Sequence, residues 1–328
     1  MYPVELITKD CEILKGIIHD DGTFEEREVD AKFIATPTFF NAHTHLADSV
    51  AKDIPRMDLI EAIKYKFGVL GSESEDEIVE GIKNSINFAL RSGTSKILEF
   101  REGGIHGFEI LRKGDDLGIC LPLTRPSSVE EAEILADLSF GFGMSSVRDH
   151  DYVFLEEIRE IAKRKKKLFA IHAGEKDDED VEGALALEPD LLIHMNMASF
   201  RNLKIAMDME IPIVSCLRSN AFFGLLNMKN YEALVEYEFW LLGTDNAMVC
   251  NPSMLEEMHF SSYLLRRDNE IFRASVKGFD LFDLEHGVVV FNKKFNLNRC
   301  RDPILGIVRR AETIDIEKVI SKFSYEHC

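Results

Sequence analysis

Potential metal ligands recur in this sequence directly after short apolar runs. His43 and His45 follow FIATPTFF, and His172 follows LFAI. His194 follows LLI, and Asp245 follows WLLGT. His43 and His45 are two residues apart, so a regular strand points both side chains to one face. Three imidazoles and one carboxylate form a ligand set for Zn²⁺ that leaves a coordination position open for water.

The remaining histidines are expected to be ordinary polar residues, because a lone histidine is more often a satisfied polar side chain than a ligand. They are His19, His106, His150, His259, His286 and His327. The metal ligands are therefore expected among the histidines that end apolar runs.

Apolar runs alternate with helical patterns through most of the chain. Eight runs begin near residues 33, 95, 119, 141, 168, 191, 212 and 239, and amphipathic segments such as SEDEIVEGIKNSINFALRSG separate them. A (β/α)8 barrel of about 250 residues requires this alternation, and its strands converge at the face that carries catalytic residues. A doubly wound open sheet shows the same alternation. No GxGxxG or GxxxxGKS loop is present to support a nucleotide-binding open sheet.

Both ends of the chain have β patterns. VELITKDCEILKGIIHDDGTFEEREV opens the sequence, and HGVVVFNKKFN follows residue 284. We therefore expect an α/β protein, a (β/α)8 TIM barrel with a small β-sandwich domain built from both termini. The small domain is predicted over residues 1–36 and 284–328, and the hydrolase barrel over residues 37–283.

Composition excludes several classes of protein and site. The net charge of −19 argues against nucleic-acid backbone binding, which needs a basic surface. The six cysteines include no CxxC pair, which argues against a disulfide framework or a thiolate zinc site. No run reaches the roughly 18 apolar residues of a membrane span, and the N-terminus lacks a secretory pattern. We expect a cytoplasmic protein that binds neither membranes nor nucleic acids.

Several motifs resemble the amidohydrolase superfamily, in its metal-dependent deaminase and chlorohydrolase branch. TPTFFNAHTHLADS resembles the HxH motif of the first strand, and IHAGE at 171–175 is similar to the fifth-strand motif of adenosine deaminases. LLGTDNA at 241–247 resembles the aspartate motif of the last strand, and DPILGIVRRAETIDIEKVI resembles the C-terminal segment of the branch. The resemblance spans nearly the whole chain.

The resemblance implies one divalent metal, Zn²⁺ or alternatively Fe²⁺. It assigns the metal ligands as a set of four: His43, His45, His172 and Asp245. Members with two metals use a bridging lysine or glutamate at the end of the third or fourth strand. GFGMSSVRD offers no lysine, and Glu99 is the one nearby candidate, so a single metal is expected.

The resemblance also implies roles for residues around the metal. Glu175 would sit beside the substrate ring, and His194 would contact the attacking water or the tetrahedral intermediate. Asp245 can take a proton from that water, while Glu175, kept protonated in a desolvated pocket, donates one to a ring nitrogen. The sequence departs from the family at Met195, where glycine is common, and in the stretch SCLRSN at 215–220.

These observations predict a deaminase that releases ammonia from a small-molecule N-heterocycle, such as a purine or pyrimidine base or nucleoside. A cyclic amidohydrolase or chlorohydrolase of the same superfamily is the first alternative, and a non-catalytic metal-binding barrel the second. Candidate substrate-binding residues near strand ends are Arg101, Arg125, Arg218 and Asn220. Ion pairing with the many acidic residues is the alternative role for the arginines. A homo-oligomer is compatible with this fold.

Overall fold

The computed structural model describes residues 1–325, so the predictions for His327 and Cys328 lie outside the described residues. The chain forms two compact units. Unit 1 comprises residues 1–41, 87–96 and 253 onward, and unit 2 comprises residues 42–86 and 97–252. Among residues 1–325, no helix combines the length and apolar character that crossing a bilayer would take.

A parallel sheet of nine strands runs through unit 2. Its order is β12-β11-β10-β9-β8-β7-β6-β5-β13. In chain order the strands are β5 (Phe39–His45), β6 (Thr94–Arg101), β7 (Cys120–Thr124), β8 (Gly141–Met144), β9 (Leu168–Ala173), β10 (Leu191–His194), β11 (Ile213–Ser215), β12 (Trp240–Leu242) and β13 (Asp245–Asn246). The predicted eighth run is thus split into β12 and β13.

The two ends of this sheet meet where β12 passes into β13. The backbone N–H of Gly243 donates to Ser215 O on β11, whereas that of Thr244 donates to His43 O on β5. A Cβ on Gly243 would lie 2.7 Å from His43 Cβ, so only glycine lets the chain pass this close to β5. Because β13 then pairs in parallel with β5, the sheet is consistent with a TIM-like barrel.

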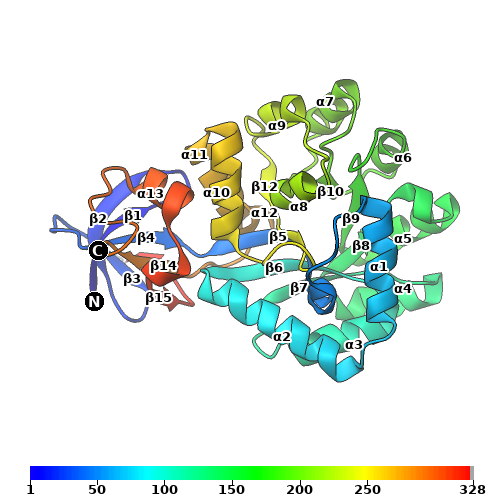
Figure 1. Cartoon of the computed structure of the whole chain (residues 1–328), viewed down its shortest axis with the longest axis horizontal. Coiled ribbons are helices and arrows are strands. Elements are labelled where there is room, and N and C mark those ends of the chain that lie inside the picture. The colour runs from blue at the N-terminus through cyan, green and yellow to red at the C-terminus, as the bar shows by residue number, and fades with distance from the viewer. Residues whose placement is uncertain (326–328) are drawn as a thin grey trace. The chain divides into compact units, whose positions relative to one another are not determined.

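Helices follow the strands of unit 2 and lie around them (Figure 1). They are α1 (Leu59–Leu70), α2 (Glu75–Arg91), α3 (Gly104–Gly114), α4 (Val129–Leu138), α5 (Tyr152–Lys165), α6 (Val181–Ala186), α7 (Phe200–Asp208), α8 (Leu217–Phe222) and α9 (Met228–Leu234), with short 3-10 turns η1 (Leu46–Ala51) and η2 (Val147–Asp149). Local sequence explains their ends. The Asp151 side chain caps α5 by accepting from Val153 N and Phe154 N, and its last turn is basic, which suits the helix dipole.

Unit 1 contains a seven-stranded sheet whose strands come from both termini, in the order β15-β14-β4-β1-β2-β3-β16. The strands are β1 (Tyr2–Ile7), β2 (Ile13–Ile18), β3 (Thr23–Glu26), β4 (Phe33–Pro37), β14 (Val288–Asn292), β15 (Ile316–Ile320) and β16 (Ser324–Tyr325). Val4 and Leu6 pack in one cluster with Val288 and Val290. The unit's helices are α10 (Met254–Leu265), α11 (Asp268–Val276), α12 (Gly278–Leu281), α13 (Pro303–Arg310) and the turn η3 (Thr313–Asp315).

Candidate metal centre

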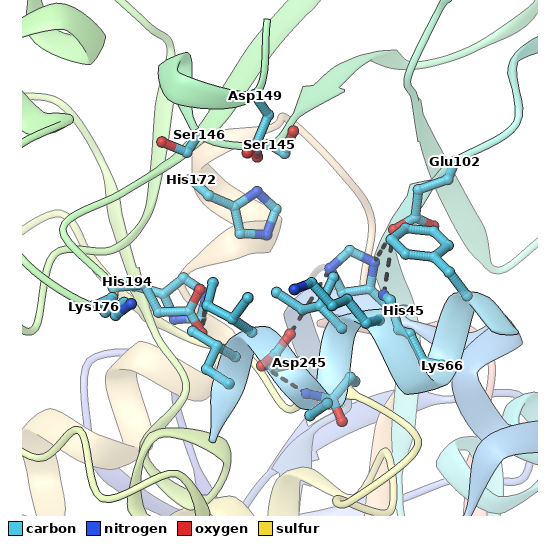
Figure 2. A pocket seen from close by; sticks show the side chains of 18 of the residues that line it. His45, Lys66, Glu102, Ser145, Ser146, Asp149, His172, Lys176, His194 and Asp245 are labelled. Carbon is cyan, nitrogen blue, oxygen red and sulfur yellow. Dashed lines mark hydrogen bonds and ion pairs between the residues drawn. The ribbon is translucent and has the colours of Figure 1, made fainter. Parts of the chain in front are cut away.

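Histidine side chains at the ends of β5, β9 and β10 lie together with Asp245, the first residue of β13 (Figure 2). His43 Nε2 lies 3.2 Å from His172 Nε2 and 3.2 Å from Asp245 Oδ1. Asp245 Oδ1 lies 3.8 Å from His45 Nε2. Two groups with ligand atoms within 4.8 Å of one another emerge: His43 with His45 and His172, and His43 with His194 and Asp245.

This donor set fits a divalent metal. Two ligand atoms at 2.0–2.1 Å from a tetrahedral zinc ion lie about 3.3 Å apart, close to the 3.2 Å separations around His43. His172 Nδ1 is 2.8 Å from Met144 O and donates to it. The Nε2 atom of the same ring is therefore unprotonated and presents its lone pair to the centre.

Burial fixes the charge state of these groups. It lowers the pKa of His43 to about 3 and holds the pKa of His172 well below its usual value, so both rings are neutral. Burial opposes the charged form of Asp245 too, but the hydrogen bond to His43 and the nearby histidines hold its pKa well below the usual range. Neutral imidazoles with an ionised carboxylate are the forms that bind a metal.

Asp245 is oriented by its neighbours and by an unusual backbone. Its Oδ2 atom accepts hydrogen bonds from Ser219 Oγ at 2.5 Å and from Asn246 Nδ2 at 3.0 Å. Its φ of 60° lies in the left-handed region, which costs energy for a residue other than glycine. These constraints leave Oδ1 facing His43 and His45.

Glu175 and His194 lie beside the ligand set. Glu175 Oε1 is 3.6 Å from His194 Nε2. Burial raises the pKa of the Glu175 carboxyl, which favours the protonated form. His194 and the next residue, Met195, both have left-handed φ values, 77° and 56°. The chain therefore turns sharply at the end of β10, where it presents His194.

A cavity of about 640 Å³ opens onto these residues, within the range of small-molecule sites. Its polar lining includes His45, His172, Glu175, His194 and Asp245. The apolar part of its wall comes mainly from α1, and its members are Leu59, Ile60, Ala62, Ile63, Phe67, Phe223 and Met248. The cavity can therefore admit a ring with apolar faces to the candidate metal site.

The four predicted substrate-binding residues have different surroundings. Arg125 lines the cavity. Among the described residues, the lining does not include Arg101, Arg218 or Asn220. Arg101 Nε donates to Gly107 O at 3.0 Å, and Arg218 Nη2 donates to Asn251 O at 2.7 Å. Asn220 is buried in α8.

Among the described residues, neither group of closely spaced ligand atoms includes Glu99, the candidate for a second metal. Its carboxylate accepts from Thr44 Oγ1 at 2.6 Å and from Leu46 N at 3.0 Å. Burial raises the pKa of Glu99 to about 8. Glu99 therefore accepts hydrogen bonds from the residues on both sides of His45.

Sequence reasoning missed a buried charged group on the cavity wall. We call Asp48, Lys66 and Glu102 the Lys66 cluster; all three line the cavity. Lys66 is one of several charged residues in LIEAIKYKFGVL, and its type and spacing gave no signal that it is buried. His150, expected to be an ordinary polar residue, lines the same cavity, where its Nε2 lies 2.9 Å from Ser145 Oγ.

Comparison with known proteins places this geometry in a family. The sequence model of the "Amidohydrolase family" matches residues 34–288. A relative from Archaeoglobus fulgidus, named "Putative aminohydrolase", is 47% identical over 98% of this chain and 96% of its own length.

Two solved structures have a similar fold at low sequence identity. The guanine deaminase from C. acetobutylicum with bound guanine has a TM-score of 0.77 and 15% identity, covering 98% of each chain. The atrazine chlorohydrolase from Arthrobacter aurescens TC1 with zinc has a TM-score of 0.78 and 13% identity, covering 97% of this chain and 93% of that one. The expected resemblance is confirmed, and with it a hydrolase of carbon–nitrogen bonds. The chain belongs to the amidohydrolase family.

Proposed function

We propose that this protein is a metal-dependent aminohydrolase that releases ammonia from a small N-heterocycle, such as a purine or pyrimidine base or nucleoside. The observation that carries the proposal is the position of Glu175, a half-buried carboxyl that lines the same cavity as His45, His172 and Asp245. A neutral carboxyl there can donate a proton to a ring nitrogen. The similarity to a guanine deaminase with bound guanine and to a relative named an aminohydrolase supports this choice.

In this proposal His43, His45, His172 and Asp245 hold one divalent metal, with zinc favoured because a solved structure of similar fold carries it. When bound, such a metal supplies the Lewis acidity that makes water a nucleophile at neutral pH. We also propose that residues 37–283 form the barrel, and that residues 1–36 and 284–328 form a small β sandwich. The shared seven-stranded sheet supports that division.

The chain's own residues then divide the proton transfers. Glu175 protonates the ring nitrogen, which makes the adjacent ring carbon more electrophilic. Asp245 accepts one proton of the attacking water and passes it to the amino group, which leaves as ammonia. The second proton of that water returns to Glu175 as the product carbonyl forms. His194, 3.6 Å from Glu175, stabilises the negative oxygen that develops on the attacked carbon. Arg125, on the cavity wall, is the remaining candidate to hold the substrate.

The test is ammonia release from a panel of bases and nucleosides by the zinc-loaded protein, with and without a chelator. We expect activity that the chelator abolishes. Glu175→Gln should keep its bound zinc but lose about 10²- to 10⁴-fold in kcat, the usual contribution of a general acid. If no compound of the panel yields ammonia, the proposal is wrong.

A second candidate function is hydrolysis of cyclic amides or chloro-substituted rings. It is favoured by the fold shared with an atrazine chlorohydrolase. Ordinary amide hydrolysis does not require protonation of a ring nitrogen. Turnover of such compounds that Glu175→Gln leaves unchanged would favour this alternative over deamination.

A further inference from the structure

Helix α1 of unit 2 carries a lysine on the face that it buries. Its sequence, LIEAIKYKFGVL, is mostly apolar, yet its buried residues are Ala62 and Lys66. Ile60, Tyr65 and Phe67 are 41–45% exposed, whereas Lys66 is 6% exposed. Ala62 and Val69 pack in an apolar cluster with Met248, so the inward face of α1 combines apolar contacts with one buried ammonium group, that of Lys66.

Lys66 makes its contacts with two carboxylates from different elements. Its Nζ atom lies 2.8 Å from Asp48 Oδ2 in η1 and 3.5 Å from Glu102 Oε1, directly after β6. Arg125 Nη1 lies 3.8 Å from the same Glu102 oxygen. Two cations thus compensate the buried carboxylate of Asp48 and the half-buried carboxylate of Glu102. Such a cluster tolerates the loss of any one member poorly, because the loss leaves an uncompensated buried charge.

The cluster reaches the candidate metal site through one atom. Glu102 Oε1, the oxygen that faces Lys66, also lies 3.2 Å from His45 Nδ1. Figure 2 shows Glu102 and Lys66 on the same side of the His45 ring. In the structure His45 Nδ1 makes no hydrogen bond, although Glu102 Oε1 is within reach. A small rotation of the His45 ring would let Nδ1 donate to Glu102. That donation would leave Nε2 of His45 free to bind a metal.

We propose that Glu102 is a positioning residue for His45, and that Lys66 holds Glu102 in place, so that the seating of helix α1 and the binding of metal are coupled. This inference rests on the proposed metal site. The coupling is reciprocal: a seated helix raises the affinity for metal, and a bound metal favours the seated helix by the same factor. Since α1 also supplies apolar residues of the cavity wall, the metal-loaded protein has the better-formed substrate cavity.

The first test measures zinc affinity by competition with a chromogenic chelator, which does not depend on turnover. We expect Glu102→Gln to bind zinc about 10- to 100-fold more weakly, the usual effect of losing a partner of a metal-binding histidine. Lys66→Met should lower the affinity by about 10-fold. Lys64→Met is the matched control, since Lys64 is an exposed lysine on the same helix, and its affinity should equal that of wild type.

The second test separates coupling from general damage. If Lys66 acts through Glu102, the Lys66→Met/Glu102→Gln double variant should lose less affinity than the product of the two single losses. Added zinc should also slow hydrogen exchange in residues 59–70 of wild type, but not of Lys66→Met. Thermal unfolding identifies a variant that fails to fold, in which case Glu102→Gln and the exchange of wild-type α1 carry the test.

The outcomes distinguish this inference from the proposed function. A wild-type protein that binds no zinc would contradict the proposed function itself. A wild type that binds zinc, with variants of equal affinity or with zinc-independent exchange of α1, would overturn the coupling alone.

Discussion

At the scale of single residues, Asp245 shows how a buried carboxylate is prepared for one task. Ser219 and Asn246 both donate to Oδ2, while Oδ1 faces the histidines. A carboxylate that rotated freely would offer either oxygen and would lose conformational entropy on binding a metal. In the proposed metal site, the hydrogen bonds to Oδ2 therefore reduce the conformational entropy that Asp245 loses when it binds the metal.

Removing Ser219 Oγ tests this role. We expect Ser219→Ala to bind zinc about 10-fold more weakly, because Asp245 loses a partner that fixes its orientation. Chelator competition measures the change. Ser262→Ala is the matched control, since Ser262 donates to buried Asp268 at the same 2.5 Å distance in unit 1. Equal zinc affinities for the two variants would show that the Ser219 hydrogen bond does not prepare the site.

Glu99 makes stability depend on pH. Burial raises its folded-state pKa to about 8, so between about pH 4.5 and 8 the folded state binds a proton that the unfolded state has released. The contribution of Glu99 to the free energy of unfolding therefore falls as pH rises through that range. Glu99→Gln should remove this dependence, and its stability relative to wild type should increase from pH 5 to pH 8. Urea unfolding at both pH values measures it, and a constant difference would contradict the assignment.

At the scale of elements, the ends of strands were predictable and the directions of side chains were not. His45 and His194 end β5 and β10, and His172 lies one residue before the end of β9, as the shared edge of parallel strands predicts. Asp245 instead begins the two-residue strand β13. Arg101 also ends a strand, but its side chain bonds back to Gly107 O, which depends on the path of the following loop. Lys66 is buried because two distant segments supply carboxylates, and no local pattern encodes that.

The turn after β10 carries a second prediction at this scale. Met195 is fully buried with a φ of 56°, where glycine would relieve strain. Losing a buried methionine costs about 2–5 kcal/mol, more than the roughly 1–2 kcal/mol of a left-handed backbone. Met195→Gly should therefore lower the free energy of unfolding by about 1–3 kcal/mol, as denaturant titration can measure. A more stable variant would mean that the backbone strain outweighs the packing.

At the scale of the whole molecule, the two termini depend on each other through the sheet of unit 1. β14 lies between β15 and β4, and it pairs with β4 from Phe33 to Pro37. A chain that stops after Asp283 lacks β14 and leaves β4 as an unpaired edge beside exposed apolar side chains.

We therefore expect the protein truncated after Asp283 to aggregate, as judged by size-exclusion chromatography. A chain that stops after Phe323 keeps Phe323, which packs against the apolar cluster of unit 1; of the described strands it loses the edge strand β16, and it should remain soluble. A monodisperse product from the shorter chain would show that unit 1 does not need its C-terminal strands.

The close approach of Gly243 to β5 has a consequence for folding during synthesis. His43 and His45 emerge early, but Asp245 comes some 200 residues later and reaches them only when the last strand closes against the first. In the proposed metal site, a half-made chain therefore lacks the carboxylate ligand, and the set of four ligands is complete only once the sheet has closed. We therefore expect tight zinc binding to appear only after that closure.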